Sequence, residues 1–211
     1  MRKPFFIFLA LLFTQICLAG KVDTVSIYSA TMKKNINCVV ITPDNYKKVK
    51  AFPTVYLLHG HGGKFSNWIT RVATLSKYAN TYQTIIVCPD GATNGWYINA
   101  TNDSNMQYET YIGKEVPAFI EAKYKTIKNR KARAITGLSM GGHGGLFLGF
   151  KNAGFFGACG SMSGALVIEY ITDKRYGIAN LLGDTTNKEL YKINSVMGQM
   201  KIIRRMRTRW Q

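Results

Sequence analysis

The 211-residue sequence is poor in acidic residues, cysteine and histidine. It holds 11 Asp and Glu against 28 Lys and Arg, with four cysteines and three histidines. After the first twenty residues there is no apolar run of about 18 residues, which excludes a polytopic membrane protein. The sequence also has no Cys-x-x-Cys pair, so a thiolate metal site of that type is excluded.

Apolar residues are abundant enough for one core. Hydrophobic residues make up 46% and aromatic residues 12%, and the length suits a single domain rather than a disordered chain, a collagen or a coiled coil. The net charge of +17 is scattered, with small clusters at residues 47–50 and 128–133. No nucleic-acid motif accompanies it. We therefore expect no nucleic-acid partner, and a basic surface attracted to anionic polysaccharides or membranes.

The first residues have the pattern of a secretory signal. Arg2 and Lys3 precede an apolar run at 5–13, and small residues follow at its end. We predict a signal peptide over residues 1–19 and a secreted or periplasmic protein. Ile16 before Cys17 argues against lipidation. A retained membrane anchor is the alternative, but the apolar run is short for a bilayer, so no stable anchor is expected.

Apolar segments predict strands and helices in alternation. Strands are expected at 34–42, 54–58, 84–88, 132–136 and from 158, and helices at 68–82, 108–124 (with a kink at Pro117) and around 146–152. This order predicts an α/β fold with a mostly parallel, doubly wound sheet. Ligands of such sheets bind beyond the carboxyl ends of the strands, where both glycine-rich segments fall.

The first motif is Gly137-Leu138-Ser139-Met140-Gly141, which matches the Gly-x-Ser-x-Gly nucleophile elbow. An apolar strand precedes it and a helical run follows it. This context predicts Ser139 as a nucleophile, and the alternative is an ordinary serine in a glycine-rich turn. The second motif, His59-Gly60-His61-Gly62-Gly63, follows an earlier strand.

In hydrolases of this architecture, the loop after an early strand supplies one backbone N–H to the oxyanion hole. The residue after the nucleophile supplies the other. We assign these donors to His61 (or Gly62) and Met140. A metal site at His59-x-His61 is the alternative, but no Asp or third His follows nearby. We therefore predict no metal and no cofactor.

Several motifs, in this order, resemble the esterase family of α/β-hydrolases, which includes tributyrin and feruloyl esterases, S-formylglutathione hydrolases and mycolyltransferases. The motifs lie at 59–63, Trp68, 89–91, 94–97, 137–142 and 161–164, and the likeness runs from about residue 25 to 196. It implies an α/β-hydrolase fold and a serine esterase with a Ser–Asp–His triad. It also implies that Trp96 and Tyr97 form an aromatic wall beside the acyl site, the alternative being a core or loop pair.

The triad is incomplete by this resemblance. The family places its Asp and His beyond Val196, whereas no histidine follows His143, to which we assign a packing role. We therefore expect residues 20–200 to form an α/β-hydrolase domain that lacks the last strands and helix. For the basic tail at 201–211, our hypothesis is that a frameshift or truncation of the gene leaves these last residues out of frame. The alternative is that the basic tail is genuine.

The resulting prediction is an exported serine carboxylic-ester hydrolase that forms an acyl-enzyme on Ser139. Its expected substrates are short-chain acyl esters or acetyl and feruloyl esters linked to polysaccharide, and its activity is expected to be crippled by the missing Asp and His. The alternatives are a non-catalytic pseudoenzyme or fragment, and an acyltransferase with the same nucleophile. The sequence does not predict the oligomeric state.

Overall fold

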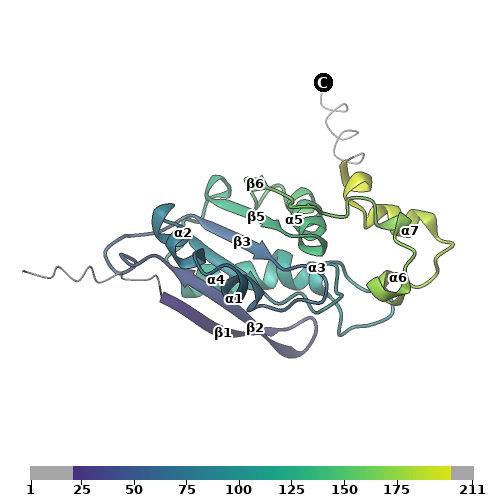
Figure 1. Cartoon of the computed structure of the whole chain (residues 1–211), viewed down its shortest axis with the longest axis horizontal. Helices are drawn as coiled ribbons and strands as arrows, with labels where there is room; N and C mark the ends of the chain where they lie inside the picture. The colour runs from purple at the N-terminus through teal and green to yellow at the C-terminus, as the bar shows by residue number, and fades with distance from the viewer. Residues whose placement is uncertain (1–20, 201–211) are drawn as a thin grey trace, which may run out of the picture.

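A computed structural model describes residues 21–200, which contain one six-stranded sheet in the order β1-β2-β4-β3-β5-β6 (Figure 1). The strands are β1 (Lys21–Ser29), β2 (Lys34–Thr42), β3 (Thr54–Leu58), β4 (Ile85–Pro89), β5 (Arg133–Gly137) and β6 (Ala158–Cys159). Strands β4, β3, β5 and β6 are parallel, whereas β1 and β2 pair antiparallel. This confirms the predicted α/β class. The predicted signal, 1–19, and the tail, 201–211, lie outside the described residues.

Helices cover both faces of this sheet. They are α1 (Asn67–Arg71), α2 (Leu75–Thr81), α3 (Tyr108–Thr110), the π-helical turn η1 (Tyr111–Glu115), α4 (Val116–Lys123), α5 (Met140–Lys151), α6 (Ile178–Leu182) and α7 (Lys188–Ile193). Three short 3₁₀ turns are η2 (Arg130–Ala132), η3 (Ile168–Tyr170) and η4 (Lys174–Tyr176). Within residues 21–200, none of the helices has the length and apolar character needed to cross a membrane.

The strand β2 shows how the two faces are filled. Its Cys38 and Val40 side chains belong to the large core that includes α4 and α5, while Val39 and Ile41 belong to a smaller cluster under α1 and α2. Successive side chains of a strand point to opposite faces, so a strand buried on both sides is apolar throughout. The sheet is therefore doubly wound, as predicted.

The bounds predicted from the sequence agree best with the observed bounds for the strands β2 to β5. The observed β2 and β3 have the predicted bounds, and β4 and β5 each begin one residue later. The predicted helix at 68–82 is two helices, α1 and α2. The kink expected at Pro117 takes the form of the π-helical turn η1 directly before α4, because proline lacks the N–H that would continue the α-helical pattern.

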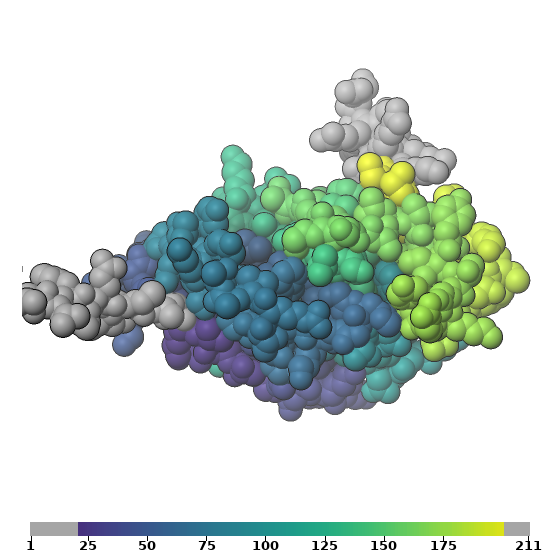
Figure 2. All heavy atoms as spheres, in the orientation of Figure 1, coloured from purple at the N-terminus to yellow at the C-terminus, as the bar shows by residue number. Residues whose placement is uncertain are grey.

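The chain after β6 forms a separate layer of short elements at the carboxyl ends of the parallel strands. This segment, which we call the cap (residues 165–200), contains η3, η4, α6 and α7. Figure 1 places α6 and α7 at the right-hand end of the molecule, beyond the arrowhead of β3, and Figure 2 shows the cap as a yellow-green lobe there. The cap thus lies at the edge of the sheet where the predicted site residues fall.

Candidate active site

Ser139 lies between the end of β5 and the start of α5. Its backbone has φ 55° and ψ −113°, and the residue is exposed. A positive φ is costly for a residue with a side chain and persists only where the surroundings hold it. Here the Ser139 N–H donates to the Met162 carbonyl at 2.8 Å. The serine is therefore presented outward on a strained turn, which is the geometry of a nucleophile elbow.

The glycines beside Ser139 are required by space. A side-chain carbon added at Gly137 would lie 2.5 Å from the Leu58 carbonyl oxygen and 2.6 Å from the Gly141 carbonyl oxygen. One added at Gly141 would lie 2.7 Å from the His59 carbonyl oxygen. The elbow therefore packs its backbone directly against the end of β3, and this close approach brings the loop after β3 beside the serine.

Two backbone donors next to Ser139 are free. A carbon added at Gly60 would lie 3.6 Å from Ser139 Cβ, so the loop is adjacent to the nucleophile. The Gly62 N–H, a predicted alternative donor, instead donates to the Thr93 carbonyl at 2.7 Å. Among the hydrogen bonds of residues 21–200, none is donated by the backbone N–H of His61 or Met140. The geometry therefore favours His61 and Met140 over Gly62 as oxyanion donors.

Hydrogen bonds from other segments hold this loop in place. The Tyr97 hydroxyl donates to the His59 carbonyl at 2.8 Å, and the Trp68 indole N–H donates to the Leu58 carbonyl at 3.0 Å. The Asp90 carboxylate accepts from the Phe65 N–H at 3.1 Å. Asp90 lies in the 89–91 motif, but the sequence analysis assigned it no role in the site. A loop fixed before substrate arrives is what electrostatic stabilisation of an oxyanion requires.

Trp96 and Tyr97, the predicted aromatic wall, are buried behind the loop. Their side chains are 2% and 0% exposed. Tyr97 packs against α5 and supports the loop through His59, and the Trp96 indole donates to the Tyr176 carbonyl at 2.8 Å. In the structure they position other residues of the site, and contact with a substrate stays a prediction.

A cleft of about 460 Å³ opens at Ser139. It is lined by His59, Gly60, His61, Asn67, Trp68, Arg71, Val72, Leu138, Ser139 and Tyr176. Its size is that of a small-molecule site, and Trp68, Val72 and Leu138 give it an apolar wall. Arg71 is the one permanently charged side chain in this lining, and no carboxylate lines it.

The His59 ring is fully engaged by backbone. Its Nε2 accepts from the Gly91 N–H at 2.9 Å, and its Nδ1 lies 2.9 Å from the Gly60 carbonyl oxygen. The first contact requires a lone pair on Nε2, so the proton is on Nδ1 and the ring is neutral. Burial lowers the pKa of His59 and favours the same state. His59 is therefore unsuited as a base or as a metal ligand.

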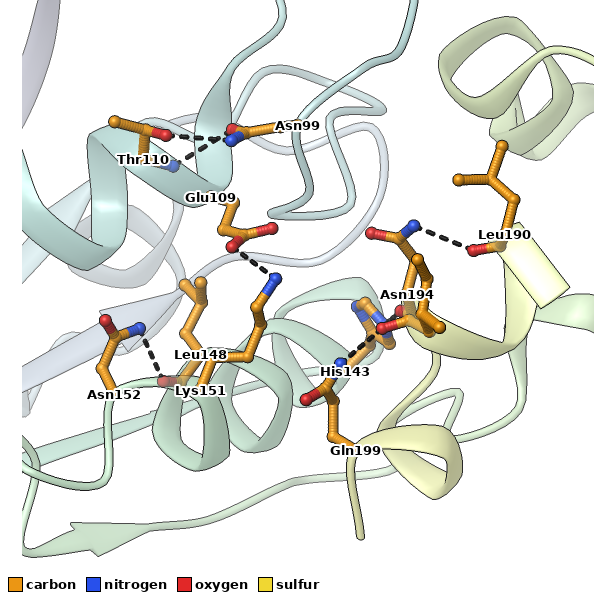
Figure 3. A network of polar contacts seen from close by, with 11 residues as sticks. Asn99, Glu109, Thr110, His143, Leu148, Lys151, Asn152, Leu190, Asn194 and Gln199 are labelled. Atoms are coloured by element: carbon orange, nitrogen blue, oxygen red, sulfur yellow. Dashed lines mark hydrogen bonds and ion pairs between the residues drawn. The ribbon is translucent and has the colours of Figure 1, made fainter. Parts of the chain in front are cut away.

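His143 is also held by backbone, as Figure 3 shows for its contact with Asn194. Its Nε2 lies 2.9 Å from the Asn194 carbonyl oxygen and its Nδ1 lies 3.0 Å from the Trp96 carbonyl oxygen, while the ring stacks on Phe147. Burial lowers the pKa of His143 to about 4, against the opposing effect of the two carbonyl groups. The residue joins α5 to the cap and supports the packing role.

His61 differs from the other two histidines. Its ring is exposed, contacts Tyr176 edge to face at 5.3 Å and lines the same cleft as Ser139. Within residues 21–200, no imidazole is hydrogen-bonded to the Ser139 hydroxyl, and no group of three His, Cys, Asp or Glu side chains lies close enough to hold a metal ion. The described part therefore presents an exposed, strained serine beside two free N–H groups, without an assembled base.

A strained serine at the carboxyl edge of a parallel sheet, beside two free N–H groups, defines the class of the protein: an α/β-hydrolase with a serine nucleophile. Residues 29–211 match the Esterase family, described as "Putative esterase". The chain belongs to this family, which confirms the resemblance inferred from the motifs.

Individual relatives are similar over different shares of their length. An acetyl esterase of Caldicellulosiruptor saccharolyticus is 29% identical over 199 residues, which are 88% of this chain and 72% of that protein. Esterase Rv1288 of Mycobacterium tuberculosis is 34% identical over 134 residues, but these are 59% of this chain and 28% of that protein. The structure of an S-formylglutathione hydrolase from Agrobacterium tumefaciens shares the fold, with a TM-score of 0.74 at 22% identity over 86% of this chain and 71% of that one.

Proposed function

We propose that the protein is an exported serine carboxylic-ester hydrolase, acting in the periplasm or outside the cell. Its substrates would be short-chain acyl esters, or acetyl and feruloyl esters linked to polysaccharide. One observation carries the proposal: Ser139 is exposed at φ 55° in a cleft, next to the free N–H groups of His61 and Met140. The similarity to an acetyl esterase supports the substrate class.

In this proposal the Ser139 hydroxyl attacks the ester carbonyl carbon, and the carbonyl oxygen becomes an oxyanion that accepts hydrogen bonds from His61 and Met140. Expulsion of the alcohol leaves an acyl-enzyme, which water then hydrolyses. The apolar wall formed by Trp68, Val72 and Leu138 suits a short acyl chain.

The attack also needs an acceptor for the serine proton. In the family that the chain resembles, the Asp and His that fill this role lie beyond the position of Val196, whereas no histidine follows His143 in this sequence. Loss of the base lowers kcat by factors on the order of 10⁴ or more. The alternative is a non-catalytic protein with the same cleft. The reactivity of Ser139 therefore distinguishes the two hypotheses.

The test uses a fluorophosphonate probe and short-chain p-nitrophenyl esters. Because no imidazole contacts the Ser139 hydroxyl within residues 21–200, we expect the probe to label the folded chain slowly, and the label to vanish in Ser139→Ala. Ser163→Ala is the matched control, because Ser163 is also exposed and also has a positive φ, of 50°. Absence of labelling in a folded sample, or equal loss in both variants, would reject the activated serine and favour the non-catalytic alternative.

Export has its own test, independent of the serine. Fractionation of the native host followed by N-terminal sequencing should find a mature chain that starts at about residue 20, outside the cytoplasm. A chain that retains Arg2 and Lys3 and stays in the cytoplasmic fraction would contradict this part of the proposal.

A further inference from the structure

Two basic segments that are far apart in the sequence lie side by side in the structure. They are residues 43–53, before β3, and residues 123–132, before β5. Phe52 pairs with Thr126, its N–H donates to the Lys125 carbonyl at 2.8 Å, and its carbonyl accepts from the Ile127 N–H at 2.9 Å. We call the surface formed by these two segments the basic end.

The basic end lies at the opposite end of the sheet from the cleft. Strands β3 and β5 are parallel, and the two basic segments precede them (Figure 1). The loops that carry His61 and Ser139 follow the same two strands. A large ligand could therefore occupy the basic end without entering or covering the cleft.

Positive charge dominates this surface. Residues 43–53 contain three lysines and residues 123–132 contain five Lys or Arg, which gives eight cations against one acid, Asp44. That carboxylate accepts a hydrogen bond from the Asn80 side chain at 2.7 Å. The basic residues are all exposed: Lys47, Lys48, Lys50, Lys123, Lys125, Lys128, Arg130 and Lys131.

Two of these cations build the surface, while others remain available to a ligand. The Lys125 ammonium donates to the Tyr46 and Lys47 carbonyls at 3.3 and 3.1 Å, and so joins the two segments. Arg130 donates to the Ala153 carbonyl at 3.0 Å. By contrast, the side chains of the other six, all lysines, have no hydrogen bond or ion pair within residues 21–200: Lys47, Lys48, Lys50, Lys123, Lys128 and Lys131.

We infer that the basic end binds an acidic polysaccharide. The free cations are lysines, which act as point charges and suit a flexible polyanion better than a ligand that needs bidentate recognition. Stable docking on a lipid surface needs inserted apolar groups beside the charge, and Ile127, 39% exposed, is the one large exposed apolar residue of these two described segments. The choice of a polysaccharide rests on the proposed function, because such a polymer would carry the esters that the cleft hydrolyses.

Affinity electrophoresis of the full chain in gels with polygalacturonate tests this inference. We expect retardation that weakens steeply with added salt, as for other polyanions. Changing Lys47, Lys48, Lys128 and Lys131 together to Gln should weaken binding about tenfold or more. The matched control changes Lys64, Lys114, Lys174 and Lys188 to Gln, which removes the same charge from exposed positions elsewhere. This control should stay within about twofold of the wild type, because local charge density rather than net charge holds the polymer.

Ser139→Ala separates the inference from the proposed function, because it should abolish ester hydrolysis and leave polymer binding unchanged. Equal weakening in both lysine variants would overturn the inference and leave only net charge. So would strong binding to phosphatidylglycerol vesicles that is lost in the basic-end variant while polygalacturonate binding persists. If the fourfold variant melts at a lower temperature, the pairs Lys47/Lys48 and Lys128/Lys131 replace it, each with an intermediate loss expected.

Discussion

At the scale of single residues, the space around the elbow determines which substitutions the site tolerates. Gly137→Ala would force a carbon to within 2.5 Å of the Leu58 carbonyl oxygen, so the elbow or β3 must shift. We expect the free energy of unfolding to fall by about 2 kcal/mol or more. Gly154→Ala is the control, because a carbon there meets nothing within 4 Å. Urea denaturation measures both, and similar stability of the two variants would contradict this packing argument.

The oxyanion donors can be tested without removing the nucleophile. His61→Pro removes a backbone N–H, whereas His61→Ala removes only the ring. If the N–H stabilises the oxyanion, His61→Pro should lower kcat about 10² to 10³-fold, and His61→Ala should retain most of the activity. Esterase assays with thermal melts for both variants check this. A loss of similar size in His61→Ala would show instead that the imidazole, which lines the cleft, takes part in the reaction.

Motifs assigned candidate site residues that are close in sequence, but they did not predict the contacts that long-range packing adds around these residues. Ser139, His61 and Met140 could be assigned because the elbow and the oxyanion loop have fixed local spacing. The Gly62 N–H donates to the Thr93 carbonyl, and Trp96 is buried. Both facts depend on how the segment after β4 folds. No pattern along the chain reports how such a segment folds over its neighbours.

At the scale of elements, the sequence predicted the central strands to within one residue and the elements around them less well. Strands β2 and β3, apolar on both faces, have the predicted bounds. The strand β1 was not predicted, because its alternation of buried and exposed residues covers only the second half, around Val25 and Ile27. The helix α5 begins at Met140, six residues before the expected start, because its first turns are rich in glycine that close packing requires.

The link between Trp96 and the cap gives a prediction at this scale. Its indole donates to the Tyr176 carbonyl, and Tyr176 lines the cleft. Trp96→Phe removes this hydrogen bond, so we expect faster amide exchange across η4 and α6 and a higher KM for esters, with a smaller change in kcat. Tyr78→Phe, on the exposed side of α2, is the control. Unchanged exchange in the cap would show that other contacts hold η4.

At the scale of the whole molecule, the cap is joined to the sheet by apolar packing and a few polar contacts rather than by strands. Its Ile168, Ile178 and Leu182 side chains belong to the large core. His143 of α5 meets the Asn194 carbonyl, Trp96 meets Tyr176, and the Thr101 N–H donates to the Leu181 carbonyl at 2.8 Å. Two of these contacts involve His143, to which the sequence analysis assigned a packing role, and Trp96, which it placed beside the acyl site. The arrangement of the cap beside the cleft thus depends on contacts between residues far apart in the sequence. The stability of this packing can be measured as a function of pH.

Burial of His59 and His143 makes stability depend on pH in a defined direction. The pKa of His143 falls to about 4 in the folded chain, against about 6.5 when unfolded, and burial lowers that of His59 as well. Between these values the unfolded state binds more protons, so the free energy of unfolding should decrease as pH falls from about 6.5 towards 4, by up to about 3 kcal/mol for His143.

His143→Gln keeps a donor but cannot titrate. We expect it to be less stable at pH 7 and to show a shallower decline, with His59 accounting for part of what remains. Urea titrations at several pH values compare the two proteins, so that carboxylate contributions common to both cancel. Parallel curves for wild type and variant would mean that His143 is already protonated between its two carbonyl oxygens in the folded state.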